Sequence, residues 1–122
     1  MQSRAYATHN GAGWVLDVRR FWTEGSVDTS RRPVLLIPGY CMNTFVLSFH
    51  PEGRSMIEYL TDHGFEVWTA DLRGQGESRS IGGARNFGFD ALALGDLPKA
   101  LATVREHTQT ERKRVDIIGC SL

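Results

Sequence analysis

The sequence has few cysteines, no long apolar run and no excess of charge of either sign. Its 122 residues carry 14 basic and 14 acidic side chains, so no strong field attracts a nucleic acid or an anionic bilayer. The two cysteines, Cys41 and Cys120, are too few to staple a small secreted domain and suit a reducing compartment. No segment approaches the roughly 20 apolar residues of a membrane span. We therefore expect a cytoplasmic protein with no membrane span and no nucleic-acid partner.

Metal and nucleotide signals are also missing. The chain has four histidines, His9, His50, His63 and His107. No two of them have the i, i+4 spacing that places two ligands on one helix face. Gly74-Gln75-Gly76 follows an apolar run as a dinucleotide loop would, but Arg79 occupies the position of the third glycine. The sequence therefore predicts neither a metal nor a cofactor.

Hydrophobic residues make up 41% of the chain, enough for the core of a single domain. Three largely apolar runs, of which the first is uninterrupted, predict core strands that are buried on both faces. They are Val34–Ile37, Phe65–Ala70 and Val115–Ile118. Before them, residues 14–22 alternate in polarity and follow Asn10-Gly11, a pair that supplies the positive φ angles of a tight turn. That pattern predicts an N-terminal β-hairpin.

Helical signals lie between the apolar runs. Ser55 and Glu58 form a capping box for a first helix, and Gly64 stands at its predicted end. Asp96 is the predicted N-cap of a second helix, whose apolar residues recur at i, i+4 and i+7 from Leu97. Strands that alternate with helices pair in parallel through right-handed crossovers. The sequence thus predicts the α/β class, with a mostly parallel sheet and flanking helices.

The segments that follow the three strands are the places to look for chemistry, because ligands of open α/β sheets gather at the carboxyl ends of strands. The last of these segments is Gly119-Cys120-Ser121-Leu122. A sharp strand-to-helix turn that exposes a serine needs small residues two places to either side of it. Gly119 meets the first half of this requirement, so Ser121 is a candidate nucleophile. The alternative is a turn without chemistry.

Taken together, three motifs resemble the first half of an α/β-hydrolase in both order and spacing. They are Leu36–Tyr40, Trp68–Ser78 and Val115–Leu122. The stretch from Phe89 to Pro98 further resembles the acid-lipase and polyhydroxyalkanoate-synthase-like branch. The resemblance covers most of the chain from Trp14 onward. It implies the N-terminal half of an α/β-hydrolase fold, preceded by the hairpin.

The resemblance also implies roles for individual residues. Ser121 would be the nucleophile, and the backbone amides of Leu122 and Tyr40 would form the oxyanion hole. Many relatives have His where this chain has Pro38, an exchange that removes a side-chain hydrogen-bonding group and leaves the backbone donor. The turn from Asp71 to Ser78 would be structural, with Asp71 and Arg73 available for local hydrogen bonds.

The cysteines offer a second nucleophile. Polyhydroxyalkanoate synthases, which resemble this chain, carry a catalytic Cys in the elbow, but at the position that Ser121 occupies here. Cys120 should instead point toward the sheet. We predict that Cys41 and Cys120 are packed thiols without a disulfide. Four aromatic residues are likewise predicted to belong to the core rather than to a substrate wall: Trp14, Phe45, Phe49 and Phe89.

All four histidines precede Ser121. In α/β-hydrolases the triad follows the chain order nucleophile, acid, base. Residues 1–122 therefore read as a single partial domain, truncated at the nucleophile elbow, whose last strand would be an exposed edge. The parent protein would hydrolyse a carboxylic ester of a small molecule through an acyl-serine intermediate, and this stretch alone would lack efficient turnover.

Two other functions stay open on the sequence. One is an acyltransferase or polyhydroxyalkanoate-synthase-like enzyme, which differs only in what attacks the acyl-enzyme. The other is a non-catalytic small α/β interaction module, because fold alone does not establish function.

Overall fold

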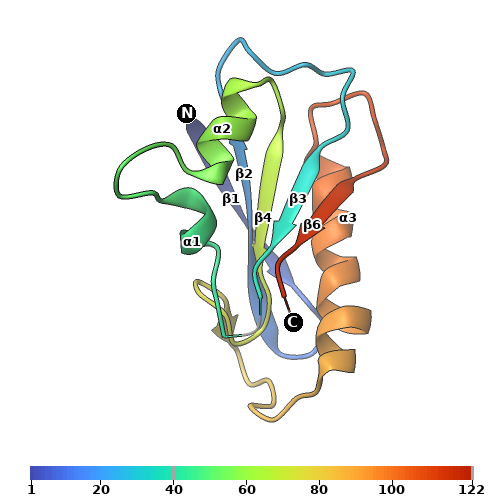
Figure 1. Cartoon of the computed structure of the whole chain (residues 1–122). Coiled ribbons are helices and arrows are strands. Elements are labelled where there is room, and N and C mark those ends of the chain that lie inside the picture. Colours follow the sequence, from blue (N-terminus) through green and yellow to red (C-terminus); the bar gives the residue numbers. More distant parts are fainter. Residues whose placement is uncertain (40, 122) are drawn as a thin grey trace.

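The structure is a computed structural model that describes residues 1–39 and 41–121 (Figure 1). In chain order, its elements are β1 (Gln2–His9), β2 (Trp14–Trp22), β3 (Val34–Ile37), α1 (Phe45–Ser48), α2 (Met56–Asp62), β4 (Val67–Asp71), β5 (Arg79–Ser80), η1 (Ala91–Asp96), α3 (Leu97–His107) and β6 (Asp116–Gly119). Element η1 is a π-helix that continues directly into α3. None of the helices described is long and apolar enough to cross a membrane.

The described strands form one six-stranded sheet in the order β1-β2-β4-β3-β6, with the short β5 paired to β2. Strand β3 is parallel to both β4 and β6, whereas β2 is antiparallel to β1, β4 and β5. Val34 lies opposite both Val67 and Asp116, so the three parallel strands are in step and their carboxyl ends meet at one edge. The predicted α/β class is confirmed, with an antiparallel hairpin added on one side.

The predicted N-terminal hairpin is confirmed as β1 and β2, but its connection is longer than a two-residue turn. Gly11 and Gly13 both have positive φ, 79° and 83°, and the buried side chain of Asn10 organises the loop. The Oδ1 atom of Asn10 accepts hydrogen bonds from the backbone amides of Ala12 at 2.8 Å and Trp14 at 3.1 Å. Asn10 thus shapes the loop through the hydrogen bonds of its side chain and not through a positive φ of its own.

Helices cover both faces of the sheet, giving a three-layer arrangement with α3 on one side and α1 and α2 on the other (Figure 1). The α3 face buries Trp14, Leu16, Val18, Leu35, Trp68, Ala70, Leu72, Ala100 and Val104. The opposite face buries Phe21, Val34, Leu36, Leu47, Ile57 and Val67. Each fully buried large apolar side chain contributes about 1.5–3 kcal/mol. The central strands β3 and β4, buried on both faces as predicted, therefore form a rigid base for the loops at their carboxyl ends.

Helix α2 begins as the sequence predicts. The Ser55 side chain accepts a hydrogen bond from the Glu58 amide at 3.1 Å, and the Glu58 carboxylate accepts one from the Ser55 amide at 3.3 Å. Both bonds of the capping box are therefore present. Just past the helix, Gly64 has a φ of 87°, the left-handed conformation of a helix end.

The prediction that Asp96 caps α3 is wrong. Asp96 has helical backbone angles, because η1 extends the helical segment six residues toward the N-terminus. No helix start therefore exists at Asp96, and its side chain makes no cap hydrogen bond. Its carboxylate turns instead into the protein, where it binds Arg73.

Strand β6 does not have the buried environment that its apolar sequence predicts. It occupies one end of the strand order, and Ile117 and Ile118 are 45% and 39% exposed. In the described structure β6 is an exposed edge, as the resemblance to a partial domain implies. Apolar side chains such as those of Ile117 and Ile118 allow a strand to be buried, but the elements that pack against the strand decide whether it is buried.

Three of the four aromatic residues predicted to be core residues are exposed. Trp14 is buried, but Phe45, Phe49 and Phe89 are 64%, 54% and 66% exposed. The rings of Phe45 and Phe49 stack on each other with centroids 5.3 Å apart, on the outside of α1. Cys41 is exposed as well, so its prediction as a packed thiol is also wrong.

Candidate functional site

Ser121 lies at the end of β6 in a strained backbone conformation. Its φ is 60°, and among the described residues only Cys41 shares a positive φ without being a glycine. Such a conformation costs a non-glycine residue about 1–3 kcal/mol and is concentrated at functional sites. The Cys120 amide donates a hydrogen bond to the Ile37 carbonyl at 3.1 Å, which holds the end of β6 against β3. The strained residue thus lies just beyond the carboxyl end of β6, close to the loop that follows β3.

Gly39 lets the loop after β3 approach Cys120 and Ser121 closely. A Cβ at Gly39 would collide with the Cys120 carbonyl oxygen and lie 3.1 Å from the Ser121 Cβ. The backbone after Gly39 turns immediately, since the Met42 amide donates to the Gly39 carbonyl at 3.0 Å. Any larger residue would therefore separate the loop from Cys120 and Ser121.

The two residues predicted to supply the oxyanion hole, Tyr40 and Leu122, lie outside the described residues. Their predicted role stays a prediction. The structure describes the residues next to them, Gly39 with its hydrogen bond from the Met42 amide and Ser121 with its positive φ.

The turn after β4 fixes this loop from a second direction. Gln75 donates from its amide nitrogen to the Gly39 carbonyl at 3.2 Å, and its amide oxygen accepts from the Leu72 amide at 3.0 Å. Gln75 therefore clamps the loop to the end of β4, a contact that sequence reasoning missed. No pattern in the sequence marks this contact, because Gln75 and Gly39 are 36 positions apart.

Asp71 holds the same region on its other side. Its buried carboxylate accepts hydrogen bonds from the Thr44 amide at 3.0 Å, the Thr44 hydroxyl at 3.3 Å and the Glu77 amide at 3.2 Å. Gly76 leaves room for that carboxylate, because a Cβ there would collide with it. As predicted, Asp71 makes a local hydrogen bond within this turn, to the Glu77 amide, whereas Arg73 binds a distant residue instead of a local one.

Arg73 and Asp96 form a buried ion pair beneath the π-helix. The guanidinium donates from Nε and Nη2 to the two carboxylate oxygens, both at 2.9 Å, and the Arg73 amide adds a third bond at 3.0 Å. Asn10 donates a fourth to Asp96 at 2.8 Å. The hydrogen bond to Asp96 raises the pKa of Arg73 above its ordinary value, so the Arg73 guanidinium stays charged. No sequence spacing predicted this contact, which joins three separate segments.

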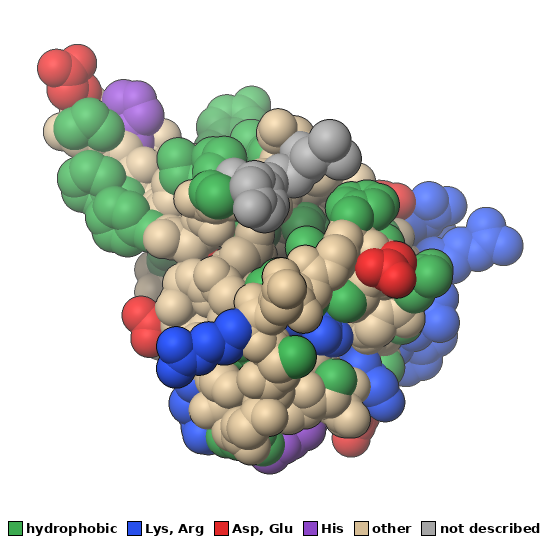
Figure 2. Space-filling view, turned by 90° about the horizontal axis from the view of Figure 1, so that it is seen from below, with side chains coloured by type: hydrophobic (Ala, Val, Ile, Leu, Met, Phe, Trp, Pro, Cys, Tyr) green, Lys and Arg blue, Asp and Glu red, His purple; other side chains and the backbone are tan. Residues whose placement is uncertain are grey.

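A cavity of about 550 Å³ opens beside Ser121, within the size range of small-molecule sites. Its described lining residues are Ile37, Pro38, Leu72, Gln75, Phe87, Gly88, Phe89, Leu92, Ala93, Leu97 and Ser121. None of them is charged. Figure 2 views this end of the molecule, toward which β3, β4 and β6 run, and shows several separate groups of hydrophobic side chains there. Apart from the Ser121 hydroxyl and the Gln75 amide, the side chains that line the cavity are apolar.

The other candidate groups are not brought into this cavity. Cys120 packs against the apolar cluster on the α1 and α2 face, and both cysteines are free thiols. No histidine is among the described lining residues. Over residues 1–39 and 41–121, no group of three or more His, Cys, Asp or Glu side chains could hold a metal ion. Of the predicted site residues that are described, Ser121 alone lines the cavity.

The model of the alpha/beta hydrolase fold family matches residues 32–122. With three quarters of its length matched, and with parallel strands that end at a strained serine, the chain belongs to that family. This confirms the resemblance seen in the sequence.

Solved structures of similar fold agree. A hypothetical protein of Pseudomonas aeruginosa has a TM-score of 0.69 at 19% identity, and an esterase of Pyrococcus furiosus has 0.68 at 19%. A candidate epoxide hydrolase of Pseudomonas aeruginosa has 0.63 at 26%. These alignments cover 97%, 97% and 98% of this chain but only 35%, 41% and 32% of those structures. No curated protein matches the sequence.

Proposed function

We propose that the protein is a serine hydrolase that cleaves a carboxylic ester of a small molecule through an acyl-Ser121 intermediate. One observation carries the proposal: Ser121 has a strained, left-handed backbone and lines an apolar cavity at the carboxyl end of the parallel strands. Family membership supports a hydrolase, and strained backbone at an exposed serine is how a nucleophile elbow presents its hydroxyl.

In this reaction the Ser121 Oγ attacks the ester carbonyl carbon while its proton passes to a general base. The carbonyl oxygen becomes an oxyanion, which backbone amides such as those of residues 40 and 122 would stabilise; removing one such donor typically costs about 3–4 kcal/mol. Collapse of the intermediate expels the alcohol, which takes up the proton. Water then attacks the acyl-serine with help from the same base and releases the acid.

The base and its acid partner are proposed to lie outside residues 1–122, which would form a partial domain. All four histidines precede Ser121, and none is among the described residues that line the cavity. The chain spans about a third to two fifths of the similar structures. Residues 1–122 alone are therefore expected to turn over esters poorly, because serine without a base is a weak nucleophile.

The test is labelling of the full-length gene product with a fluorophosphonate, followed by peptide mapping. We expect the label on Ser121 and its loss in Ser121→Ala. Ser80→Ala, which removes an exposed serine of β5, is the matched control and should keep the label. A label that persists in Ser121→Ala, or that maps to Cys120, would contradict the proposal. Complete absence of labelling in folded full-length protein would favour the non-catalytic module.

A further inference from the structure

The cavity beside Ser121 offers almost nothing that could bind a charged or strongly polar group. Gln75 and Ser121 are the polar side chains among its described lining residues. Both ends of the Gln75 amide are engaged, with the Gly39 carbonyl and the Leu72 amide. A charged group placed there would lose its hydration without gaining a partner. An apolar group would lose nothing and would remove the lining side chains from water.

One wall of this cavity is held in place by the buried core beneath it. The wall consists of residues 87–97, which include η1. Below it, Asp96 binds Arg73 through two 2.9 Å hydrogen bonds and is completely buried. At the other end of the wall, Phe87 packs edge-on against Trp14 with ring centroids 6.0 Å apart. Because both ends are tied to buried groups, the cavity is present before any ligand arrives.

The wall varies in the size of its side chains. Phe87, Leu92 and Leu97 contribute large side chains, whereas Ala93, on the π-helix between them, contributes a single methyl group. A larger side chain at Ala93 would project into the cavity volume. The neighbouring Leu94 is 79% exposed and is not among the lining residues, so the same helix offers a matched control position.

We propose that this cavity holds the acyl group of the ester, that it selects an uncharged apolar acyl chain longer than acetyl, and that Ala93 sets the length accepted. The inference rests on the proposed role of Ser121. The acyl group, rather than the alcohol, is assigned to the cavity because it stays bonded to the serine oxygen after the alcohol has left. A preformed cavity that includes Ser121 can hold that group through both halves of the reaction.

The experiment measures kcat/KM of the full-length protein with p-nitrophenyl acetate, butyrate and octanoate, and compares the pentanoate with the glutarate monoester, which ends in a carboxylate. Each buried methylene should raise kcat/KM about fourfold until the cavity is filled, so we expect octanoate to exceed acetate at least tenfold. The charged ester should fall at least tenfold below its neutral counterpart.

Substitution of Ala93 tests the limiting residue. In Ala93→Phe and in the smaller Ala93→Leu, the octanoate to acetate ratio should fall at least tenfold. In Leu94→Phe, which adds a ring outside the cavity, the ratio should stay within twofold of wild type. The ratio corrects for any loss of active protein, and two substitutions of different size guard against misfolding of one.

Three results would overturn the inference while Ser121 is still labelled by the fluorophosphonate: equal rates for all acyl lengths, a preference for the charged ester, or an Ala93→Leu ratio equal to wild type. Failure of Ser121 to react with the fluorophosphonate would mean instead that the proposed function is wrong.

Discussion

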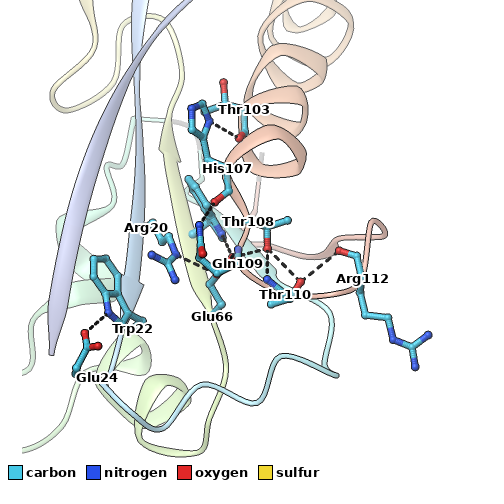
Figure 3. A network of polar contacts seen from close by, with 11 residues as sticks. Arg20, Trp22, Glu24, Glu66, Thr103, His107, Thr108, Gln109, Thr110 and Arg112 are labelled. Atoms are coloured by element: carbon cyan, nitrogen blue, oxygen red, sulfur yellow. Dashed lines mark hydrogen bonds and ion pairs between the residues drawn. The ribbon is translucent and has the colours of Figure 1, made fainter.

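The two ends of helix α3 are anchored by similar buried carboxylates, yet only one of them borders the cavity. At the beginning of α3, Asp96 accepts four hydrogen bonds, three from Arg73 and one from Asn10. Beyond its end, Glu66 also accepts four. Three come from Arg20 Nε at 2.9 Å, the Thr108 hydroxyl at 2.7 Å and the backbone amide of Gln109 at 3.0 Å (Figure 3). The fourth comes from Trp68 Nε1 at 2.6 Å.

Both carboxylates anchor α3, but only Asp96 also supports the wall of the cavity. Glu66 precedes β4 and Arg73 follows it, so the two networks lie at opposite ends of a five-residue strand about 17 Å long. Both fasten α3 to the sheet. Asp96 in addition fixes the helical wall whose residues Leu92, Ala93 and Leu97 line the cavity. Loss of either carboxylate should therefore lower stability, but only loss of Asp96 should also change the preference for ester chain length.

The largest effect is expected for Asp96→Ala. It leaves the buried Arg73 charge without its partner, so the free energy of unfolding should fall by about 3–5 kcal/mol. The octanoate to acetate ratio should change as well, because the cavity wall loses its anchor. Urea unfolding and ester kinetics of the full-length protein measure the two effects. Asp90→Ala, which removes an exposed carboxylate six residues earlier, should show neither at this size.

Glu66→Gln should affect stability alone. It leaves the Arg20 charge buried without a counterion, so we expect a loss of about 3 kcal/mol by the same unfolding measurement. The octanoate to acetate ratio of the folded protein should stay within twofold of wild type, because no member of this network is among the described lining residues. A change in that ratio as large as that of Asp96→Ala would remove the distinction between the two ends.

Gly39→Ala tests the close approach at the carboxyl ends of the strands. Its methyl group would collide with the Cys120 carbonyl and push the loop away from Ser121. Displacement of a catalytic group by about 1 Å can cost about a hundredfold in rate, which is the expected fall in fluorophosphonate labelling of Ser121. Gly53→Ala, at a glycine whose added Cβ would have no atom closer than 3.6 Å, is the control and should label normally.

A smaller effect is expected for Gln75→Leu. The substitution removes the hydrogen bond to the Gly39 carbonyl and the one from the Leu72 amide, each worth about 1 kcal/mol. We expect labelling of Ser121 to slow about five- to thirtyfold with its site unchanged. Gln75→Glu, which keeps the acceptor for the Leu72 amide and loses the donor to Gly39, should lie between wild type and Gln75→Leu. Wild-type labelling in Gln75→Leu would show that the clamp positions nothing.

The sequence predicted well those features that depend on neighbouring residues. The capping box of Ser55 and Glu58, the end of that helix at Gly64 and the apolar strand Val34–Ile37 are each encoded within a few residues and are confirmed. The three strands and their order then defined the sheet edge at which Ser121 lies.

Features that depend on distant partners were predicted poorly. Asp96 carries the sequence pattern of an N-cap, but the π-helix that precedes α3 leaves no helix start there, and its carboxylate binds Arg73, 23 positions away. Ile117 and Ile118 are apolar enough to be buried, but exposure is decided by what packs against β6. The Gln75 clamp has no sequence signature, because the Gly39 carbonyl that it binds is 36 positions earlier.

The proposed acyl-Ser121 intermediate can be tested directly. The full-length protein is quenched in acid during turnover of p-nitrophenyl octanoate, and the acyl group is located by tandem mass spectrometry. We expect an octanoyl ester on the Ser121 oxygen. An octanoyl group on Cys120, or on any other residue, would contradict it.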